Sequence, residues 1–196
     1  MERMRNICVF CGSQSGADAR YRQTAIELGG LLAQRGHGLV YGGGHVGLMG
    51  IIADAVMQAG GTVTGVIPKP MTERELAHET VTKLYVVSSM HERKALMASL
   101  SDAFIALPGG YGTLEELFEV IAWAQLGIHR KPIGVLNVAG YFDALIAFVD
   151  HTIAEGFVKS KYRGLFVTAD QPPALLDALQ RHHLPPTRRW LTEEET

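Results

Sequence analysis

The stretch SDAFIALPGGYGTLEE, residues 101–116, decides the fold. A short apolar run stands between Asp102 and Pro108, which is typical of a buried strand. Glycines then fill three of the four positions 109–112, and the pattern Thr113-x-x-Glu116 is typical of a helix start. These residues predict a strand, a tight loop and a helix N-terminus in immediate succession.

This loop has the properties of an anion-binding site. Glycine permits positive φ angles and a close backbone approach, and the free N–H groups of a first helical turn lie at the positive end of the helix dipole. We interpret Gly109–Gly112 as a phosphate cradle. Two alternatives stay open: the glycines serve only a tight turn, or Thr113 as N-cap and Glu116 three residues later form a capping box without a catalytic role.

Composition limits the class of protein. With 196 residues, 47% apolar and 19% charged, the chain suits one α/β domain, expected over residues 1–184, with an acidic and mobile tail over 185–196. The net charge of −2, with no block of lysines and arginines, argues against nucleic acid as a partner. No apolar run reaches the about 18 residues of a membrane span, and no signal peptide is visible. We therefore expect a cytoplasmic protein with no membrane partner.

The cysteines and histidines give no metal or redox signal. Cys8 and Cys11 form a Cys-x-x-Cys pattern, but they fall in a strand-like run, where an odd separation points side chains to opposite faces. The histidines are scattered, and His91-Glu92 is not followed by the second histidine of a zinc motif. We expect no metal site and no cofactor.

Strand and helix patterns alternate along the whole chain. The expected strands cover residues 6–11, 38–41, 62–67, 81–87, 103–107, 132–138 and 165–168, and the expected helices cover 18–36, 51–60, 90–98, 113–126, 141–155 and 172–183. This alternation predicts an α/β fold, a Rossmann-like three-layer sandwich whose mostly parallel sheet is covered by helices on both faces. The polar segment 68–79 is longer than a usual connection, so it is a candidate lid or binding loop.

Three expected strands end in glycine-rich loops, at residues 12–16, 42–47 and 109–112. Ligands of open α/β sheets bind at the carboxyl ends of the strands, so the three loops should meet at one crevice. Gly42-x-Gly44-x-x-Gly47 also matches the dinucleotide fingerprint. The next strand, however, ends without the acidic residue that binds a ribose hydroxyl, which argues against a nicotinamide enzyme.

Three charged residues accompany these loops. Arg93 and Lys94 stand in the first turns of a helix, where cations oppose the dipole, so they either bind an anion or are ordinary surface cations. Glu116 stands near a helix N-terminus, where we expect a lowered pKa and an ionised carboxylate unsuited to general-acid work. A phosphate cradle, a cation and a carboxylate together suit cleavage beside a sugar phosphate, because a carboxylate stabilises an oxocarbenium-like sugar.

Two of these motifs carry a family resemblance. Pro108–Glu116 reproduces Pro-Gly-Gly-x-Gly-Thr-x-x-Glu and Met90–Lys94 reproduces Met-His-x-Arg-Lys, so the chain resembles the Lonely Guy (LOG) family of cytokinin-activating phosphoribohydrolases. The resemblance implies a homodimer without a cofactor that hydrolyses nucleoside 5'-monophosphates, preferably with an N6-alkylated adenine, to the free base and ribose 5-phosphate. The alternative is a non-catalytic nucleotide or pterin-phosphate carrier on the same fold.

The resemblance also implies site residues. It assigns catalysis to Glu116 and Arg93. The expected substrate- and phosphate-binding residues are Glu75, Lys94, Gly109, Gly110, Tyr111, Gly112, Thr113, Glu115, Gly12, Ser13, Gly43, Gly44 and Met90. Family members have also been labelled lysine decarboxylases, but that chemistry needs a Schiff-base lysine and a pyridoxal site, neither of which this sequence suggests.

Overall fold

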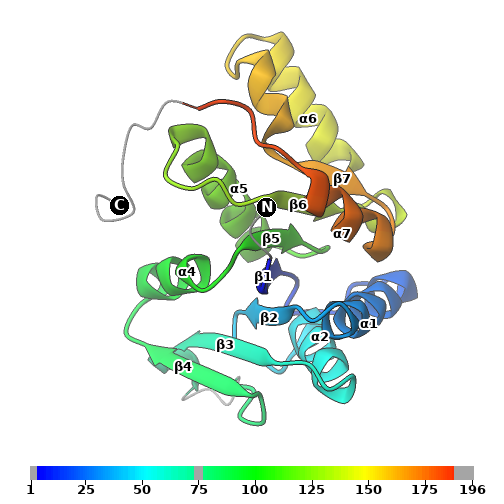
Figure 1. Ribbon diagram of the computed structural model, residues 1–196, viewed down its shortest axis with the longest axis vertical. Coiled ribbons are helices and arrows are strands. Elements are labelled where there is room, and N and C mark those ends of the chain that lie inside the picture. The colour runs from blue at the N-terminus through cyan, green and yellow to red at the C-terminus, as the bar shows by residue number, and fades with distance from the viewer. Residues whose placement is uncertain (1–3, 73–76, 188–196) are drawn as a thin grey trace.

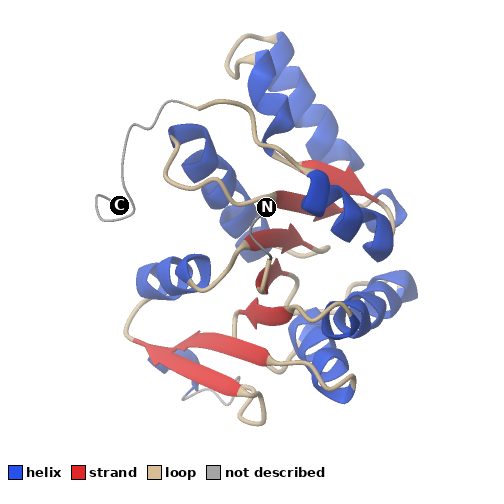
Figure 2. Ribbon diagram, viewed as in Figure 1, coloured by secondary structure: helices blue, strands red, loops and turns tan. Residues whose placement is uncertain are grey.

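The structure is a computed structural model, and it describes residues 4–72 and 77–187. These residues form a three-layer α/β sandwich (Figures 1 and 2). Within the described residues the strands are β1 (Asn6–Phe10), β2 (Gly38–Tyr41), β3 (Val63–Pro68), β4 (Lys83–Val87), β5 (Ala103–Ala106), β6 (Ile133–Leu136) and β7 (Val167–Ala169). They form one sheet in the order β4-β3-β2-β1-β5-β6-β7. Every neighbouring pair is parallel.

Helices connect successive strands. They are α1 (Ala19–Gln34), α2 (Gly47–Gln58), α3 (Lys69–Thr72), α4 (Met90–Ser99), α5 (Tyr111–Leu126), α6 (Asp143–Ala154) and α7 (Pro172–Arg181), with the short 3-10 helices η1 (Val138–Gly140) and η2 (Ser160–Leu165). The helix α3 occupies part of the polar segment 68–79, where the sequence predicted no helix. Among the described residues no helix combines the length and the apolar character needed to cross a membrane.

Alternate side chains of each strand feed two separate cores. On β1, Ile7 and Val9 pack with α1, α2 and α7, whereas Cys8 and Phe10 pack with α4 and α5. Cys11 lies in the core opposite to that of Cys8, and both thiols are free. Figure 2 shows the strands in a row between the two groups of helices. The expected sandwich is confirmed, and the two cysteines point to opposite faces as expected.

Local sequence signals account for the helix ends near the site. The Asp18 side chain accepts a hydrogen bond from the Arg20 N–H at 2.9 Å and so begins α1, and Gly36 ends this unit with a φ of +73°. Ser89 caps α4 by accepting from the Glu92 N–H at 3.1 Å. The Glu92 carboxylate in turn accepts from the Ser88 N–H at 2.7 Å, which fixes where β4 turns into α4.

The sheet order reverses at β1. From this strand the chain builds outward through β2, β3 and β4 on one side, and through β5, β6 and β7 on the other. The loops that follow β1 and β5 therefore leave neighbouring strands for different helices, which is the place where open α/β sheets bind ligands.

Candidate active site

The glycine-rich loops after β1 and β5 are joined by backbone hydrogen bonds. The Gly12 N–H donates to the Pro108 carbonyl at 3.1 Å, and the Gly12 carbonyl accepts from the Leu48 N–H of α2 at 3.0 Å. Position 47 requires glycine, because its φ is +60° and a Cβ there would collide with the Ser13 backbone. The structure thus brings three strand-end loops to one place.

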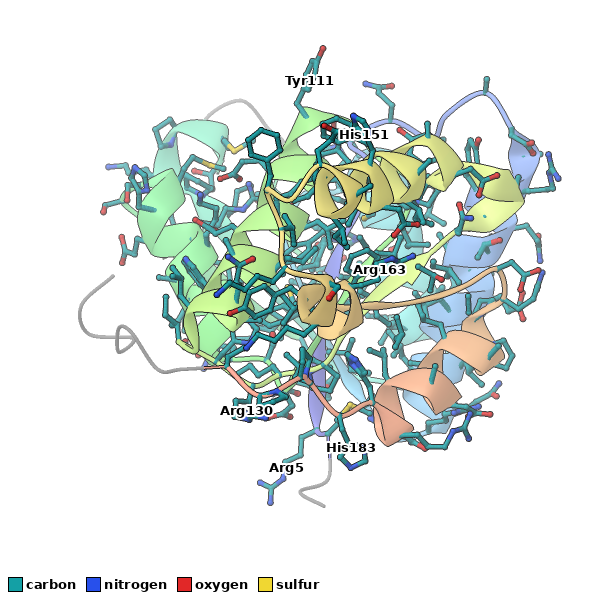
Figure 3. All side chains as sticks on the ribbon, turned by 90° about the horizontal axis from the view of Figure 1, so that it is seen from above. Arg5, Tyr111, Arg130, His151, Arg163 and His183 are labelled. Carbon is teal, nitrogen blue, oxygen red and sulfur yellow. The ribbon has the colours of Figure 1, made fainter. Side chains whose placement is uncertain are left out.

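A pocket of about 280 Å³ opens between the loops that follow β1 and β5. It is lined by Gly12, Ser13, Gln14, Ser15, Gly16, Tyr21, Leu48, Pro108, Gly109, Gly110 and Tyr141. The first N–H groups of an α-helix have no intrahelical acceptor. Gly110, the N-cap of α5, has no side chain that could accept from them. Tyr111, at the tip of this edge of the molecule, is 93% exposed and projects outward in Figure 3. An anion at this helix end would meet N–H donors and the positive end of the dipole.

The capping box at Thr113, which the sequence left open as an alternative, is absent. The helix α5 begins at Tyr111, which makes Thr113 its third residue and Glu116 its sixth. Thr113 is buried with its hydroxyl beside Gly109, where a Cβ would collide with it. The alternative that Thr113 and Glu116 merely cap the helix is therefore wrong, and Glu116 is left without a capping role.

Arg93 lies inside the protein. Only 8% of the residue is exposed, and its guanidinium donates from Nε to the Val66 carbonyl and from Nη2 to the Gly42 carbonyl, both at 3.2 Å. Its Nη1 lies 3.7 Å from the Met90 sulfur. These contacts fix the cation at the ends of β2 and β3, so the alternative of an ordinary surface cation is wrong.

The Glu116 carboxylate faces this guanidinium. Its Oε1 lies 3.9 Å from Arg93 Nη2, and 9% of the residue is exposed. Burial raises the pKa of Glu116 to about 7, although the positive charge of Arg93 opposes the increase. The expectation of a lowered pKa is wrong for two reasons. The helix dipole acts most strongly on the first turn, and Glu116 lies beyond that turn. The carboxylate is also largely removed from water. Glu116 therefore exchanges a proton near neutral pH.

Lys94 forms ion pairs with two carboxylates of α5. Its Nζ lies 2.5 Å from Glu115 Oε1 and 2.8 Å from Glu119 Oε1. Burial opposes the charge, but the two hydrogen-bonded carboxylates raise the pKa of Lys94, so it stays an ammonium. Two residues expected to bind nucleotide, Lys94 and Glu115, thus bind each other and tie α4 to α5.

The loop after β2 joins the site from the other side. Gly43 has a φ of +73° and its carbonyl accepts from the His78 N–H at 2.9 Å, while Gly44 forms an isolated antiparallel bridge with Ala77. These contacts bring the segment that begins at residue 77 against the glycine loop. Glu75, the remaining expected substrate contact, lies outside the described residues.

Comparison with known proteins identifies the family. Residues 49–179 match a family model described as "Possible lysine decarboxylase". A rice protein named "Probable cytokinin riboside 5'-monophosphate phosphoribohydrolase LOGL9" is 57% identical over 180 residues, which cover 92% of this chain and 79% of that protein. The chain belongs to the LOG family. Another relative, "Cytokinin riboside 5'-monophosphate phosphoribohydrolase LOG7" of Arabidopsis thaliana, is 53% identical over 92% of this chain and 83% of its own length.

The LOG-family chain also shares its fold with a more distant solved structure. The molybdenum cofactor carrier protein of Chlamydomonas reinhardtii aligns with a TM-score of 0.70 and 23% identity, over 91% of this chain and 98% of that one. At this identity the likeness extends to the fold alone.

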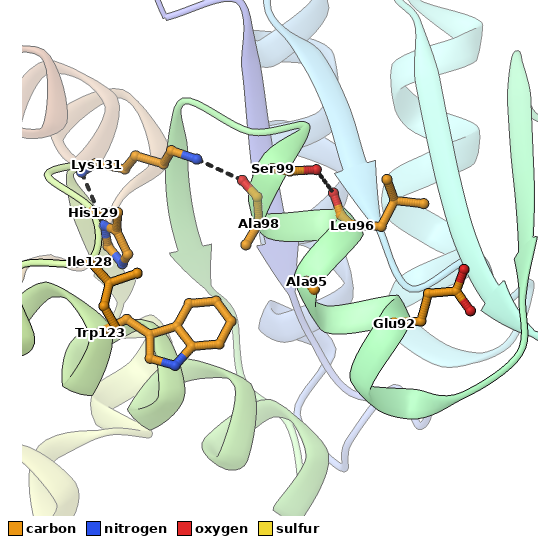
Figure 4. Close-up of a pocket in the computed structure, with 9 residues that line it drawn as sticks. All are labelled: Glu92, Ala95, Leu96, Ala98, Ser99, Trp123, Ile128, His129 and Lys131. Carbon is orange, nitrogen blue, oxygen red and sulfur yellow. Dashed lines mark hydrogen bonds between the residues drawn. The ribbon is translucent and has the colours of Figure 1, made fainter. Parts of the chain in front are cut away.

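Another pocket of this LOG-family chain lies away from the glycine loops, between α4 and α5 (Figure 4). Its volume is about 350 Å³, and its lining residues are Glu92, Ala95, Leu96, Ala98, Ser99, Trp123, Ile128, His129 and Lys131. None of them belongs to the expected site. Within the described residues, no group of three or more His, Cys, Asp or Glu side chains could hold a metal ion.

The sequence reasoning missed two aromatic residues at the pocket between the glycine-rich loops. Tyr21 of α1 and Tyr141, which follows β6, both line the glycine pocket, and their rings lie 5.6 Å apart in an edge-to-face arrangement. Tyr141 could have been predicted from the sequence, because β6 ends at the same edge of the sheet as β1 and β5, and ligands of such sheets bind at the carboxyl ends of the strands. Tyr21 had no comparable signal, since only the packing of α1 brings it there.

Proposed function

We propose that this chain hydrolyses the N-glycosidic bond of adenosine 5'-monophosphates, with preference for adenine alkylated on N6, to the free base and ribose 5-phosphate. The observation that carries the proposal is the buried Glu116 carboxylate 3.9 Å from the Arg93 guanidinium, on the helix whose N-terminus has free N–H groups. LOG-family relatives at 57% and 53% identity bear the name of this activity, which supports the same assignment.

The geometry separates phosphate binding from bond cleavage. Glu116 is five residues after Tyr111, which places it about 7.5 Å along α5 from the helix start. A phosphate on the first N–H groups of α5 would let the ribose extend toward Glu116. In the reaction the C1'–N9 bond breaks, water adds its hydroxyl to C1', and a proton reaches the departing base. The ionised Glu116 stabilises the positive sugar while this bond breaks.

Arg93 has donors left for the substrate. A guanidinium offers five N–H groups, and its three contacts, with Val66, Gly42 and Met90, leave two of them unused among the described residues. A buried cation with free donors suits an anionic or hydroxyl-bearing ligand at the same site. We propose that Arg93 orients the ribose or phosphate while it balances the charge of Glu116.

Substitution of Gly42 tests the importance of this placement. In Gly42→Ala the new Cβ would collide with Arg93 Nη2 and lie 3.4 Å from the Met49 sulfur. We expect a loss of about 1–3 kcal/mol in unfolding free energy together with weaker nucleotide turnover, because the guanidinium must move. The matched control is Gly30→Ala in α1, where the new Cβ would have no heavy atom within 4 Å apart from the neighbouring backbone of its own helix. The control should gain about 0.5–1 kcal/mol. Equal behaviour of both variants in urea unfolding and turnover would contradict the proposed placement.

The pH dependence of turnover tests which form of Glu116 acts. If the ionised carboxylate stabilises the sugar cation, kcat at saturating substrate should rise with pH, with a midpoint at or above the pKa of about 7 that Glu116 has in the ligand-free chain, because the negative phosphate of a bound nucleotide disfavours ionisation. Saturating substrate is used because a free nucleotide phosphate titrates near pH 6 and would add its own effect. A kcat that falls over the same range would show that the protonated form is active, as a general acid toward the base.

A direct assay separates hydrolysis from carriage. The purified protein is incubated with AMP and with N6-isopentenyl-AMP, and products are resolved by chromatography. Free base and ribose 5-phosphate are expected, with faster release from the alkylated substrate. Nucleotide that binds and is recovered intact would support a carrier in place of an enzyme. Decarboxylation of lysine is not expected, because Schiff-base chemistry needs a neutral amine and Lys94 is held as an ammonium.

We also propose that the protein is a cytoplasmic homodimer. Large apolar side chains are exposed near the site on α4 and α5: Met90 is 45% exposed, Tyr111 93% and Phe118 40%. Tyr111 and Phe118 are seven residues apart and so lie on the same side of α5, and exposed apolar side chains on one side of a helix support a subunit interface. The free and buried cysteines suit a reducing compartment. Light scattering coupled to size-exclusion chromatography would measure the assembly directly.

A further inference from the structure

The loop after β6 has a strained and tightly bonded conformation. Ala139 has a φ of +55°, the one positive value at a non-glycine residue in the described part of the chain. The Asn137 side chain accepts from the Phe142 N–H at 2.7 Å and donates to the Asp143 carboxylate at 2.7 Å. Such strain persists only where the surrounding structure enforces it, and it is frequent at functional sites. The residue that this loop presents to the site is Tyr141.

Tyr141 bonds directly to the phosphate cradle. Its hydroxyl donates to the Gly109 carbonyl at 2.7 Å, and its ring packs edge-on against Tyr21 at 5.6 Å and Phe142 at 4.9 Å. Gly109 itself has no room for a side chain, because a Cβ would lie 2.8 Å from the Gly12 nitrogen. The cradle is therefore anchored through its backbone.

The Gly109 carbonyl and the Gly110 N–H belong to the same planar peptide unit. A hydrogen bond that fixes the carbonyl also fixes the direction of this N–H. Two adjacent glycines would otherwise let the peptide rotate easily, because neither residue carries a side chain that restricts φ and ψ. Gly110 is the N-cap of α5, so the orientation of this peptide determines how the helix N-terminus meets an anion.

We propose that Tyr141 is a positioning residue for the phosphate of the substrate, acting through the Gly109–Gly110 peptide. The inference rests on the proposed function for the identity of the ligand, a nucleoside 5'-monophosphate. Tyr141 itself does no chemistry on the sugar. Its hydroxyl prearranges the N–H donors that receive the phosphate, and this preorganisation strengthens binding.

The test is Tyr141→Phe, which keeps the ring and its packing but removes the hydroxyl. We measure affinities for AMP, adenosine and inorganic phosphate by calorimetry in a Glu116→Gln background, in which AMP should not be cleaved, and KM and kcat in the chain that keeps Glu116. Loss of one hydrogen bond of about 0.5–1.5 kcal/mol predicts an affinity for AMP and for inorganic phosphate lower by about 2- to 13-fold. The affinity for adenosine should not change, and the effect should appear in KM while kcat stays within about twofold.

Tyr162→Phe is the matched control, because Tyr162 lies in η2 with its ring 4.9 Å from the Lys161 ammonium and does not line the glycine pocket. It should behave as the wild type. The ratio of AMP to adenosine affinity within one preparation is insensitive to any loss of folded protein, so a lower melting temperature does not obscure the result. An unchanged ratio in Tyr141→Phe would overturn the inference. If the wild type binds AMP without cleaving it, the proposed function fails, but the same ratio still tests Tyr141.

Discussion

Replacing Glu116 with glutamine is expected to lower kcat for AMP hydrolysis by about 10²- to 10⁴-fold, a loss typical for removal of one positioned catalytic group. Glutamine keeps the length and shape of the side chain but cannot carry the negative charge that stabilises an oxocarbenium-like sugar. Since Glu116 lies one and a half turns beyond the phosphate cradle, the affinity for AMP should stay within about threefold.

The measurement pairs single-turnover hydrolysis with an independent binding titration. The matched control is Glu27→Gln, the same chemical change at an exposed position of α1. Wild-type turnover in Glu116→Gln would show that catalysis resides elsewhere. A variant that loses affinity and turnover together would indicate that Glu116 positions the substrate, because a purely catalytic charge affects kcat alone.

The fold could be predicted from the sequence because each strand and helix is indicated by residues that are close together in the chain. Apolar runs bounded by turn residues predicted the strands, residue spacing predicted helices over 18–36 and 90–98, and the alternation of elements predicted the parallel sheet. The convergence of glycine loops followed from a general property of such sheets, that ligands bind at the carboxyl ends of the strands. These inferences need no knowledge of side-chain burial.

The electrostatics of the site were not accessible in the same way. Thr-x-x-Glu predicted a helix start at Thr113, but Gly110 begins α5 three residues earlier, and this offset moves Glu116 out of the first turn. Its ionisation is then governed by burial, which depends on how α4 and α5 pack. Arg93 was likewise ambiguous in the sequence, because its acceptors, the Val66 and Gly42 carbonyls, lie on other strands. Long-range contacts decide the chemistry here, and single-sequence patterns do not contain them.

A buried carboxylate that must ionise for function should lower the free energy of unfolding. The substitution Glu116→Gln should restore this free energy. The pKa of Glu116 rises from an ordinary 4.5 to about 7 in the folded chain, chiefly because of burial. Between these pH values the native state binds more protons than the unfolded state, so stability falls as pH increases through this range. Above pH 7 the loss is complete and amounts to about 3 kcal/mol.

Glutamine does not titrate, so Glu116→Gln should unfold like the wild type at pH 4.5 and be more stable by up to about 3 kcal/mol at pH 8. Urea unfolding of both proteins at pH 4.5, 6 and 8 measures the difference. Glu27→Gln, at an exposed position, should show no such gain over this range. A stability difference that is independent of pH would mean that Glu116 is not the buried, proton-binding group described here. A different result is expected: Glu116→Gln gains unfolding free energy only as pH rises, and it no longer turns over substrate. This pair of results would mean that the wild-type chain keeps the catalytic charge of Glu116 at the expense of stability, as expected for a group selected for its chemistry.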